Sequence, residues 1–391
     1  MQKAPIVQKS FSSWKIKLAI LLGVGISLWM LYRGISEERF IPVENKSGDY
    51  NWIDANGDGN VNSNLSAEFN AVPKGDYVKQ TFTDALSAIR WNSKTFLWLG
   101  VALLFMVGRD FFYMLRIRLL TNKELTWKSS FSVIMLWEFA SALSPGVVGG
   151  AAVAMFILKR EKIALGRSTA IVLITTLFDN LFYIILIPFV FLFIGQADLF
   201  PTETAGSLTV QYVFWIGFSV ILFLSLFLFT AIFIGPQLAG KLLVTICKLP
   251  FLTKWRDRAS KTGEDIVLAA TEFKKENLFY WIKLFLITCG SWISRYLVIN
   301  AVLQAFLVLG FMDHILILGK QLVLWLFMLI SPTPGASGVA EYAFGELLSG
   351  FSQSALLLAT MAIIWRLISY FPYLFIGAVM LPRWLGKKNK G

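Results

Sequence analysis

The chain is 391 residues long, with 56% hydrophobic, 15% aromatic and 15% charged residues. An ordinary soluble domain carries roughly 25% charged residues, so this composition excludes a soluble, disordered or nucleic-acid-binding protein. It indicates an all-α polytopic membrane protein. The net charge of +12 is then typical of basic loops on the cytoplasmic side of a membrane, and we expect no nucleic-acid partner.

The reactive side chains are few. Two cysteines and one histidine (Cys247, Cys289 and His314) are too few for a disulfide framework or a Cys/His zinc cluster. No A-x-A-like cleavage site follows Tyr32, so we expect the first apolar run to stay in the protein as a span.

Six apolar runs reach the length of about 20 residues that a helix needs to cross the hydrocarbon core. They cover residues 14–32, 95–115, 168–194, 210–234, 278–307 and 354–380. Two further stretches, 129–158 and 321–348, are interrupted by Pro and Gly near their middles. Broken backbone at membrane depth is tolerated only when it is buried in protein or lines a cavity. We therefore predict two re-entrant hairpins, with two kinked spans as the alternative.

The basic residues predict the orientation. The N-terminus, segments 116–128, 159–167 and 236–276, and the C-terminal tail all carry an excess of Lys and Arg, whereas residues 33–94 have seven basic and nine acidic residues. These counts predict a multi-pass protein of the cell (inner) membrane with both termini cytoplasmic. The first hairpin would open inward and the second outward.

The chain divides into five segments. We expect an N-terminal tail and first span at 1–33, an extracytoplasmic loop or cap at 34–94, a first membrane repeat at 95–235, a cytoplasmic linker at 236–277, and a second membrane repeat with a basic tail at 278–391. A short helix on the membrane surface is expected over 84–91.

The two broken stretches resemble one another, because both contain Pro-Gly-x-x-Gly-x-Ala. The matched residues are Pro145, Gly146 and Gly149 in the first copy, and Pro334, Gly335 and Gly338 in the second. Paired Gly/Pro breaks of opposite orientation are typical of inverted repeats with a midplane substrate site. Free helix N-termini at such breaks suit a phosphate or carboxylate. Alternatively, Gly and Pro only permit tight packing and kinks.

Several ionisable residues fall inside the apolar segments, where each is costly unless it is paired or hydrated. Arg109, Asp110 and Lys283 lie near expected span ends, where snorkelling explains them. We expect the deeper ones to converge on the interface between the repeats; they are Glu138, Asp179, Arg295, Glu341 and Arg366. The arginines could grip an anionic head group. The acids could hold the arginines or receive protons, and fixed ion pairs without a substrate are the alternative.

Five segments carry a resemblance to a known family: GRDFFYMLRIRLL, SALSPGVVGG, TLFDN, SPTPGASGVAE and WRLISYFPYLFIGAVM. Over roughly residues 95–381 the chain resembles the flippase-like, or lysylphosphatidylglycerol synthase transmembrane region, family. The resemblance implies lipid translocation between leaflets. It covers the membrane part only, and we expect no synthase domain. The family's first break often reads P-x-R-x-G-E, whereas residues 147–150 here are Val, Val, Gly and Gly.

The loop from Asp54 onward matches part of an EF-hand-type calcium loop. Asp54, Asn56, Asp58 and Asn60 supply oxygen donors, but position 12, normally Glu, is Leu65. The pattern allows either weak calcium binding or a plain Asn/Gly turn. We expect no other cofactor.

Together these features predict an integral membrane translocase that moves an anionic phospholipid, an aminoacyl-lipid or a lipid-linked head group between leaflets. The expected partners are therefore membrane lipids, and the sequence leaves the oligomeric state open. The alternatives are a membrane-embedded lipid-modifying enzyme, for which no cluster of catalytic residues is visible, and a non-catalytic structural or regulatory membrane subunit.

Overall fold

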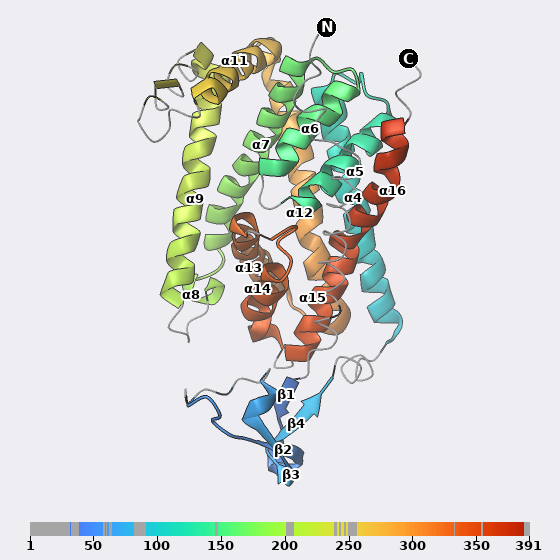
Figure 1. The fold of residues 1–391 in the computed structure, drawn as a ribbon, viewed down its shortest axis with the longest axis vertical. Coiled ribbons are helices and arrows are strands. Elements are labelled where there is room, and N and C mark those ends of the chain that lie inside the picture. The colour runs from blue at the N-terminus through green and yellow to red at the C-terminus, as the bar shows by residue number, and fades with distance from the viewer. Residues whose placement is uncertain are drawn as a thin grey trace.

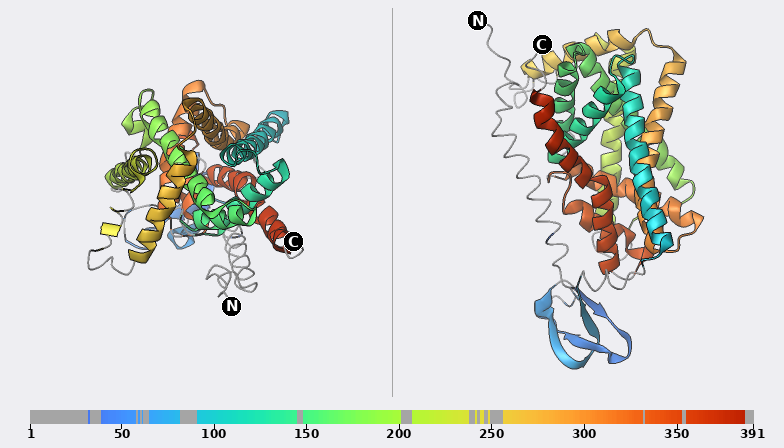
Figure 2. Two further views of the ribbon diagram at one scale, coloured as in Figure 1. Left: turned by 90° about the horizontal axis from the view of Figure 1, so that it is seen from above. Right: turned by 90° about the vertical axis from the view of Figure 1, so that its right-hand side faces the viewer.

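The computed structural model is a bundle of helices with a small β-sheet at one end (Figure 1). It describes residues 32, 39–57, 59, 61, 65–81, 91–144, 148–200, 207–237, 241, 244–245, 248, 256–331, 333–352 and 355–386. The end of the bundle beside the sheet is called the sheet end below. The opposite end, which helix α11 crosses, is called the α11 end (Figures 1 and 2).

Helices make up most of the described chain. In order they are η1 (Glu44–Lys46), η2 (Ser66–Glu68), α4 (Ser93–Leu120), α5 (Trp127–Leu143), α6 (Val148–Arg160), α7 (Leu165–Phe191), α8 (Gln196–Leu199), α9 (Ser207–Phe229), the π-helix η3 (Thr230–Ile234), α11 (Arg256–Phe273), α12 (Leu278–Phe306), α13 (Phe311–Ile330), α14 (Val339–Leu348), η5 (Ser349–Phe351), α15 (Ala355–Ser369) and α16 (Phe371–Gly386).

The described part of the chain contains six helices that are long and apolar enough to cross a membrane. They are Ser93–Leu120, Arg167–Phe191, Val210–Ile234, Leu278–Phe306, Phe311–Leu329 and Leu357–Trp384. These spans confirm the all-α polytopic fold class. Five of them match predicted spans, whereas the predicted span at 14–32 and the predicted surface helix at 84–91 lie almost wholly outside the described residues.

Helix α13 begins ten residues before the position that we predicted, 321, and is long enough to span the membrane by itself. Polar side chains near its start obscure it in the sequence, but these side chains are paired. Asp313 accepts the Gly310 N–H at 2.7 Å, Nδ2 of Asn300 on α12 lies 3.1 Å from Nδ1 of His314, and Oδ1 of Asn300 accepts a hydrogen bond from Gln321. These hydrogen bonds offset the cost of removing the polar groups from water, so the helix tolerates them.

The arms of the first broken stretch are shorter than a span. Helices α5 and α6 have 17 and 13 residues and pack against each other nearer the α11 end (Figure 1). Helix α14 has 10 residues and lies with α13 nearer the sheet end (Figure 1). The re-entrant course of both stretches and the inverted repeat stay predictions.

Helices α4 and α12 pack together along the bundle. Asn92 and Asn277 cap their first turns by accepting the backbone N–H of Thr95 and Tyr280. Gly290 of α12 lies against the ring of Phe112, because an added Cβ would stand 2.7 Å from it. A small residue at this contact lets the two helices approach closely.

The last predicted span is divided into two helices. Helix α15 ends at Ser369, α16 begins at Phe371, and Tyr370 lies between them. Pro372, which has no backbone N–H, explains the interruption at this position.

The loop expected as a cap contains an antiparallel sheet that the sequence analysis did not predict. Its strands are β1 (Arg39–Pro42), β2 (Gly48–Trp52), β3 (Phe69–Gly75) and β4 (Tyr77–Gln80), in the order β1-β4-β2-β3. Phe40 and Phe69 stack with ring centroids 4.1 Å apart, and the fully buried Glu68 accepts the indole N–H of Trp52. This small aromatic core holds the cap together.

Candidate functional site

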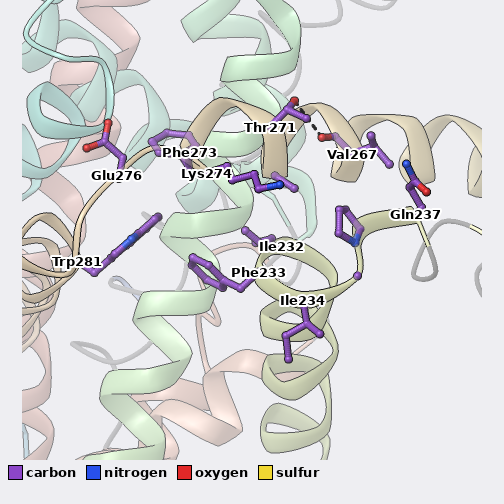
Figure 3. Close-up of a pocket in the computed structure, with 13 residues that line it drawn as sticks. Ile232, Phe233, Ile234, Gln237, Val267, Thr271, Phe273, Lys274, Glu276 and Trp281 are labelled. Carbon is purple, nitrogen blue, oxygen red and sulfur yellow. Dashed lines mark hydrogen bonds between the residues drawn. The ribbon is translucent and has the colours of Figure 1, made fainter.

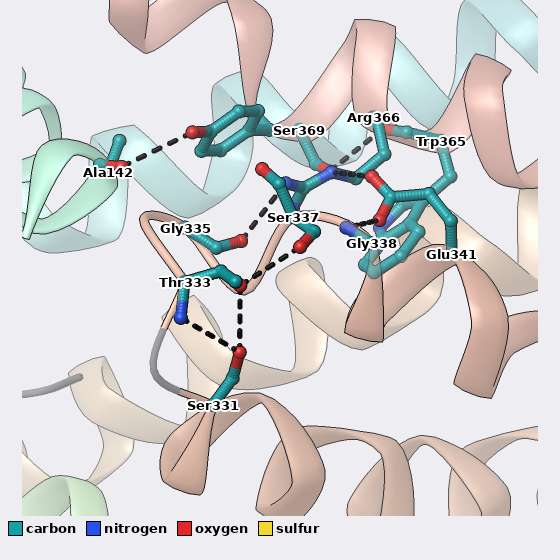
Figure 4. A network of polar contacts seen from close by, with 11 residues as sticks. Ala142, Ser331, Thr333, Gly335, Ser337, Gly338, Glu341, Trp365, Arg366 and Ser369 are labelled. Atoms are coloured by element: carbon teal, nitrogen blue, oxygen red, sulfur yellow. Dashed lines mark hydrogen bonds and ion pairs between the residues drawn. The ribbon is translucent and has the colours of Figure 1, made fainter. Parts of the chain in front are cut away.

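Arg366 of α15 lies at the break between α13 and α14 (Figure 4). Its Nε is 2.9 Å from Oε1 of Glu341, and its Nη2 donates to the Gly335 carbonyl at 3.0 Å and to Oγ of Ser337 at 3.1 Å. The guanidinium also lies over the ring of Tyr370, 3.8 Å from the centroid. Its other terminal nitrogen, Nη1, has no acceptor among the described residues, so two of its donors stay available.

The backbone of this break is shaped to hold Arg366. Gly335, Ala336 and Gly338 have positive φ angles of 58°, 55° and 85°. An added Cβ at Gly335 would stand 2.2 Å from the ring of Tyr370, so both the conformation and the contact require glycine there. Gly338 in turn donates its N–H to Oε2 of Glu341 at 2.7 Å, which fixes the acid at the start of α14.

A second buried arginine lies beside the first broken stretch. Nη2 of Arg109, on α4, is 2.7 Å from Oε2 of Glu138, on α5. Its Nη1 donates to the hydroxyl of Tyr373 at 2.6 Å, and that hydroxyl donates to Oδ1 of Asp110 at 2.7 Å. Arg109 is only 1% exposed. The expectation that it snorkels from a span end is therefore wrong, because α4 continues eleven residues further to Leu120.

Tyr370 connects the two broken stretches. Its hydroxyl donates to the carbonyl of Ala142, near the end of α5, at 3.2 Å, while its ring packs on Gly335 and Arg366. Ala142 and Tyr370 are 228 positions apart in the sequence. Tyr373, one helical turn further on, binds Arg109. The junction of α15 and α16 thus holds both arginine clusters together.

Asp179 of α7 belongs to a third cluster. Its Oδ1 accepts hydrogen bonds from Nη1 of Arg116, on α4, and from the indole of Trp292, on α12, the latter at 2.7 Å. Arg116 is buried and lies over the ring of Tyr113, 4.7 Å from its centroid. The hydroxyl of Tyr296 is buried nearby without a partner in the described chain.

Arg295 differs from the other deep arginines. It is half-buried on α12, and its guanidinium carbon lies 5.3 Å from the centroid of the Trp292 ring. No carboxylate of the described residues lies within ion-pair distance of it. Trp292 thereby links Arg295 to the Asp179 cluster without neutralising its charge.

The acids of these clusters are more accessible than the arginines. The side chains of Arg109 and Arg366 are 2% and 4% exposed, whereas those of Glu138 and Glu341 are 23% and 31% exposed. Each arginine is therefore buried, and its carboxylate partner is the more exposed member of the pair. An incoming anion could replace that carboxylate as the partner of the arginine.

The remaining predicted residues are placed as follows. Gly149 lies in the first turn of α6, the Pro334 carbonyl accepts the Ser337 N–H at 3.1 Å, and Pro145 and Gly146 lie outside the described residues. The sequence analysis missed Tyr370, Tyr373 and Arg116. Only Arg116 carried a usable signal, because it lies seven residues, or two turns, from Arg109 on one face of α4.

The predicted calcium loop forms a turn around Asp54. Its Oδ1 and Oδ2 accept the backbone N–H groups of Gly57 and Gly59 at 2.7 and 3.0 Å. Asp58 and Asn60 lie outside the described residues, and calcium binding through Asp54, Asn56, Asp58 and Asn60 stays a prediction.

Comparison with known proteins decides the family. The family model described as "Lysylphosphatidylglycerol synthase TM region" matches residues 79–377, which include all three arginine clusters. The chain belongs to this family. A curated member of the lysylphosphatidylglycerol synthase TM region family, a UPF0104 membrane protein of Archaeoglobus fulgidus, is 25% identical over 308 residues, covering 75% of this chain and 89% of that relative. No solved structure matches the chain. The protein described here is thus a multi-pass membrane protein, and its three arginine clusters lie inside the matched region.

Proposed function

We propose that this protein is a translocase that moves an anionic lipid head group between the leaflets of the cell (inner) membrane, with both termini in the cytoplasm. The substrate class is an anionic phospholipid, an aminoacyl-lipid or a lipid-linked head group. The name of the family, which refers to an aminoacylated phospholipid, supports a lipid substrate.

The single observation that carries the proposal is the contact of Tyr370 with both broken stretches. Interrupted helices of opposite orientation are typical of midplane sites in transporters. Here the residues before the first break and those of the second break meet at one aromatic side chain, beside two buried arginines. If Gly and Pro served only close packing of helices, the buried ion pairs of Arg366 and Arg109 would not be needed beside Tyr370.

The proposed chemistry is an exchange of partners at Arg366. In the structure described here its Nε faces Glu341, and its Nη1 donors have no acceptor in the described chain. A phosphate or carboxylate of the head group would bind the Nη1 donors and take the place of Glu341, whose side chain is 31% exposed. Glu341 would then be free to take up a proton, which provides a means of coupling to a proton gradient.

The re-entrant course of the two stretches belongs to the same proposal. Helices of 17, 13 and 10 residues (α5, α6 and α14) are too short to cross a core that needs about 20 residues, whereas α13 reaches that length, so re-entry of the second stretch rests on α14. If α5–α6 and α13–α14 open toward opposite sides, the Arg366 and Arg109 clusters can be reached alternately from the two leaflets.

The experiment reconstitutes the full chain in lipid vesicles. Fluorescent phosphatidylglycerol or phosphatidylcholine is placed in one leaflet, and its appearance in the other is measured by quenching. We expect fast exchange of the anionic lipid only in vesicles that contain the protein. Equal exchange with and without protein would contradict translocation, and chemical change of the recovered lipid would support the enzyme alternative.

A further inference from the structure

A cavity of about 540 Å³ lies between α11 and the end of α9, at the α11 end of the bundle (Figure 3). It is bounded by the π-helix η3, by α11 and by the first turns of α12. Its size falls within the range of about 300–1,000 Å³ that small-molecule sites occupy. None of its lining residues takes part in the contacts of Arg109, Arg116 or Arg366.

The walls of this cavity are aromatic and rigidly placed. Phe233 meets Trp281 edge-on, with ring centroids 5.0 Å apart, and Trp281 stacks on Phe178 of α7 at 5.8 Å. Ile232 and Ala270, on opposite walls, are 4% and 6% exposed. Such a surface suits a flexible hydrocarbon chain, which gains by leaving water or loose lipid contacts.

The π-helix connects the cavity with the outer surface of α9. Its final hydrogen bond runs from the Gly235 N–H to the Thr230 carbonyl at 2.8 Å, which is the i→i+5 pattern. Short π-helical turns are rare and occur frequently at functional sites. Ile234 lines the cavity and is also 72% exposed on an apolar helix. The cavity can therefore be entered from the side that faces lipid.

The lining contains one cationic side chain, Lys274, beside these apolar walls. Figure 3 shows the amine of Lys274 between α11 and the π-helix, and it makes no hydrogen bond or ion pair with any described residue. Glu276, also in the lining, lies on the α12 side, away from that amine (Figure 3). The exposed charges among the described residues of α11 cancel, since Arg256 and Lys261 are matched by Asp257 and Glu264, so the cation at the opening is Lys274. The opening therefore favours an anion.

We infer that this cavity binds an anionic phospholipid of the leaflet at the α11 end. One acyl chain enters beside Ile234 and packs between Phe233 and Trp281, and the phosphate pairs with Lys274. The site shares no residue with the proposed translocation site, so it binds lipid whether or not the protein exchanges lipid between leaflets. It tethers the amphipathic α11 and the end of α9 to the membrane.

The test is photolabelling of the full chain in vesicles. Phosphatidylglycerol with a diazirine near the end of one acyl chain is compared with phosphatidylcholine that carries the same chain, and the labelled peptides are identified by mass spectrometry. We expect the anionic lipid to label segments 230–237 and 267–281 about fivefold more than the zwitterionic lipid, the effect of one lysine near a membrane surface.

Lys274→Gln should lower this labelling to the level of phosphatidylcholine. Lys275→Gln is the matched control, because Lys275 is the next residue, is also exposed and does not line the cavity. Val267→Trp, which fills the cavity, should abolish labelling by both lipids. Equal labelling by the two lipids, or equal loss in Lys274→Gln and Lys275→Gln at an unchanged unfolding temperature, would overturn the inference.

Discussion

Individual residues at the second break are fixed by conformation as well as by contact. Gly335 combines a positive φ with a close approach to Tyr370, and its carbonyl accepts a hydrogen bond from Arg366. A residue with a Cβ would have to move either the tyrosine ring or the turn. The position of Arg366 therefore depends on a residue that carries no charge.

Gly335→Ala should lower the free energy of unfolding by about 1–3 kcal/mol, the cost of a left-handed backbone conformation at a residue with a Cβ. The matched control is Gly345→Ala in α14, where an added Cβ meets nothing within 4 Å. That change should raise stability by up to about 1 kcal/mol, because alanine favours a helix interior. Denaturant unfolding in detergent micelles measures both values, and similar values for the two variants would contradict the described turn.

The buried pair of Arg116 and Asp179 provides a second prediction. Arg116→Met leaves Asp179 with only the indole of Trp292, and it should destabilise the protein by about 3–5 kcal/mol. Adding Asp179→Asn should recover most of this loss, because both charges are then removed. Arg295→Met, which breaks no ion pair within the described chain, should cost less than about 1 kcal/mol. A double-mutant cycle of unfolding free energies checks this order, and additive effects at Arg116 and Asp179 would contradict it.

At the scale of elements, the junction of α15 and α16 holds the broken stretches in place. Tyr370 contacts the end of α5 and the turn before α14, and Tyr373 binds the arginine on α4. Gly377 on α16 lies against the ring of Phe139, since an added Cβ would stand 2.2 Å from it. A shift of α16 would therefore move residues at both breaks.

Tyr370→Phe removes the hydrogen bond to the Ala142 carbonyl and keeps the ring. We expect amide hydrogen exchange to rise together in segments 139–144 and 333–341, by the equivalent of about 0.5–1.5 kcal/mol in local stability. Tyr342→Phe is the control, because Tyr342 is 71% exposed. A rise confined to one of the two segments would show that Tyr370 does not couple them.

The apolar spans were predictable from the sequence because a membrane helix needs a long run of suitable side chains, and five predicted runs coincide with described spans. The start of α13 was not predictable, because Asp313, His314 and Gln321 are polar and their hydrogen-bond partners are known only from the structure. Glu138, Asp179, Glu341 and Arg366 stood out as charges in apolar surroundings. Tyr370 and Tyr373, which contact the arginines of these pairs, did not, since a tyrosine looks ordinary until the fold brings its partners to it.

At the scale of the whole molecule, the helical bundle carries a different structure at each of its two ends. A small aromatic sheet lies at one end, and the amphipathic α11 crosses the other (Figure 2). The charged clusters lie between them, on helices from both halves of the matched family region. At this scale the proposed function requires that the Arg366 cluster acts on lipid and does not serve packing alone.

The measurement that tests this requirement most directly is leaflet exchange of phosphatidylglycerol by the paired variant Arg366→Met with Glu341→Gln. Removing both charges together should leave stability close to that of the unaltered protein. Loss of the guanidinium contacts should slow exchange by at least about tenfold, since hydrogen bonds to charged groups contribute about 1.5–3 kcal/mol. The control is Arg167→Met with Glu124→Gln, a pair with a partly exposed acid outside the clusters, which should exchange lipid normally. A folded Arg366→Met, Glu341→Gln protein that exchanges phosphatidylglycerol as fast as the control would contradict the account.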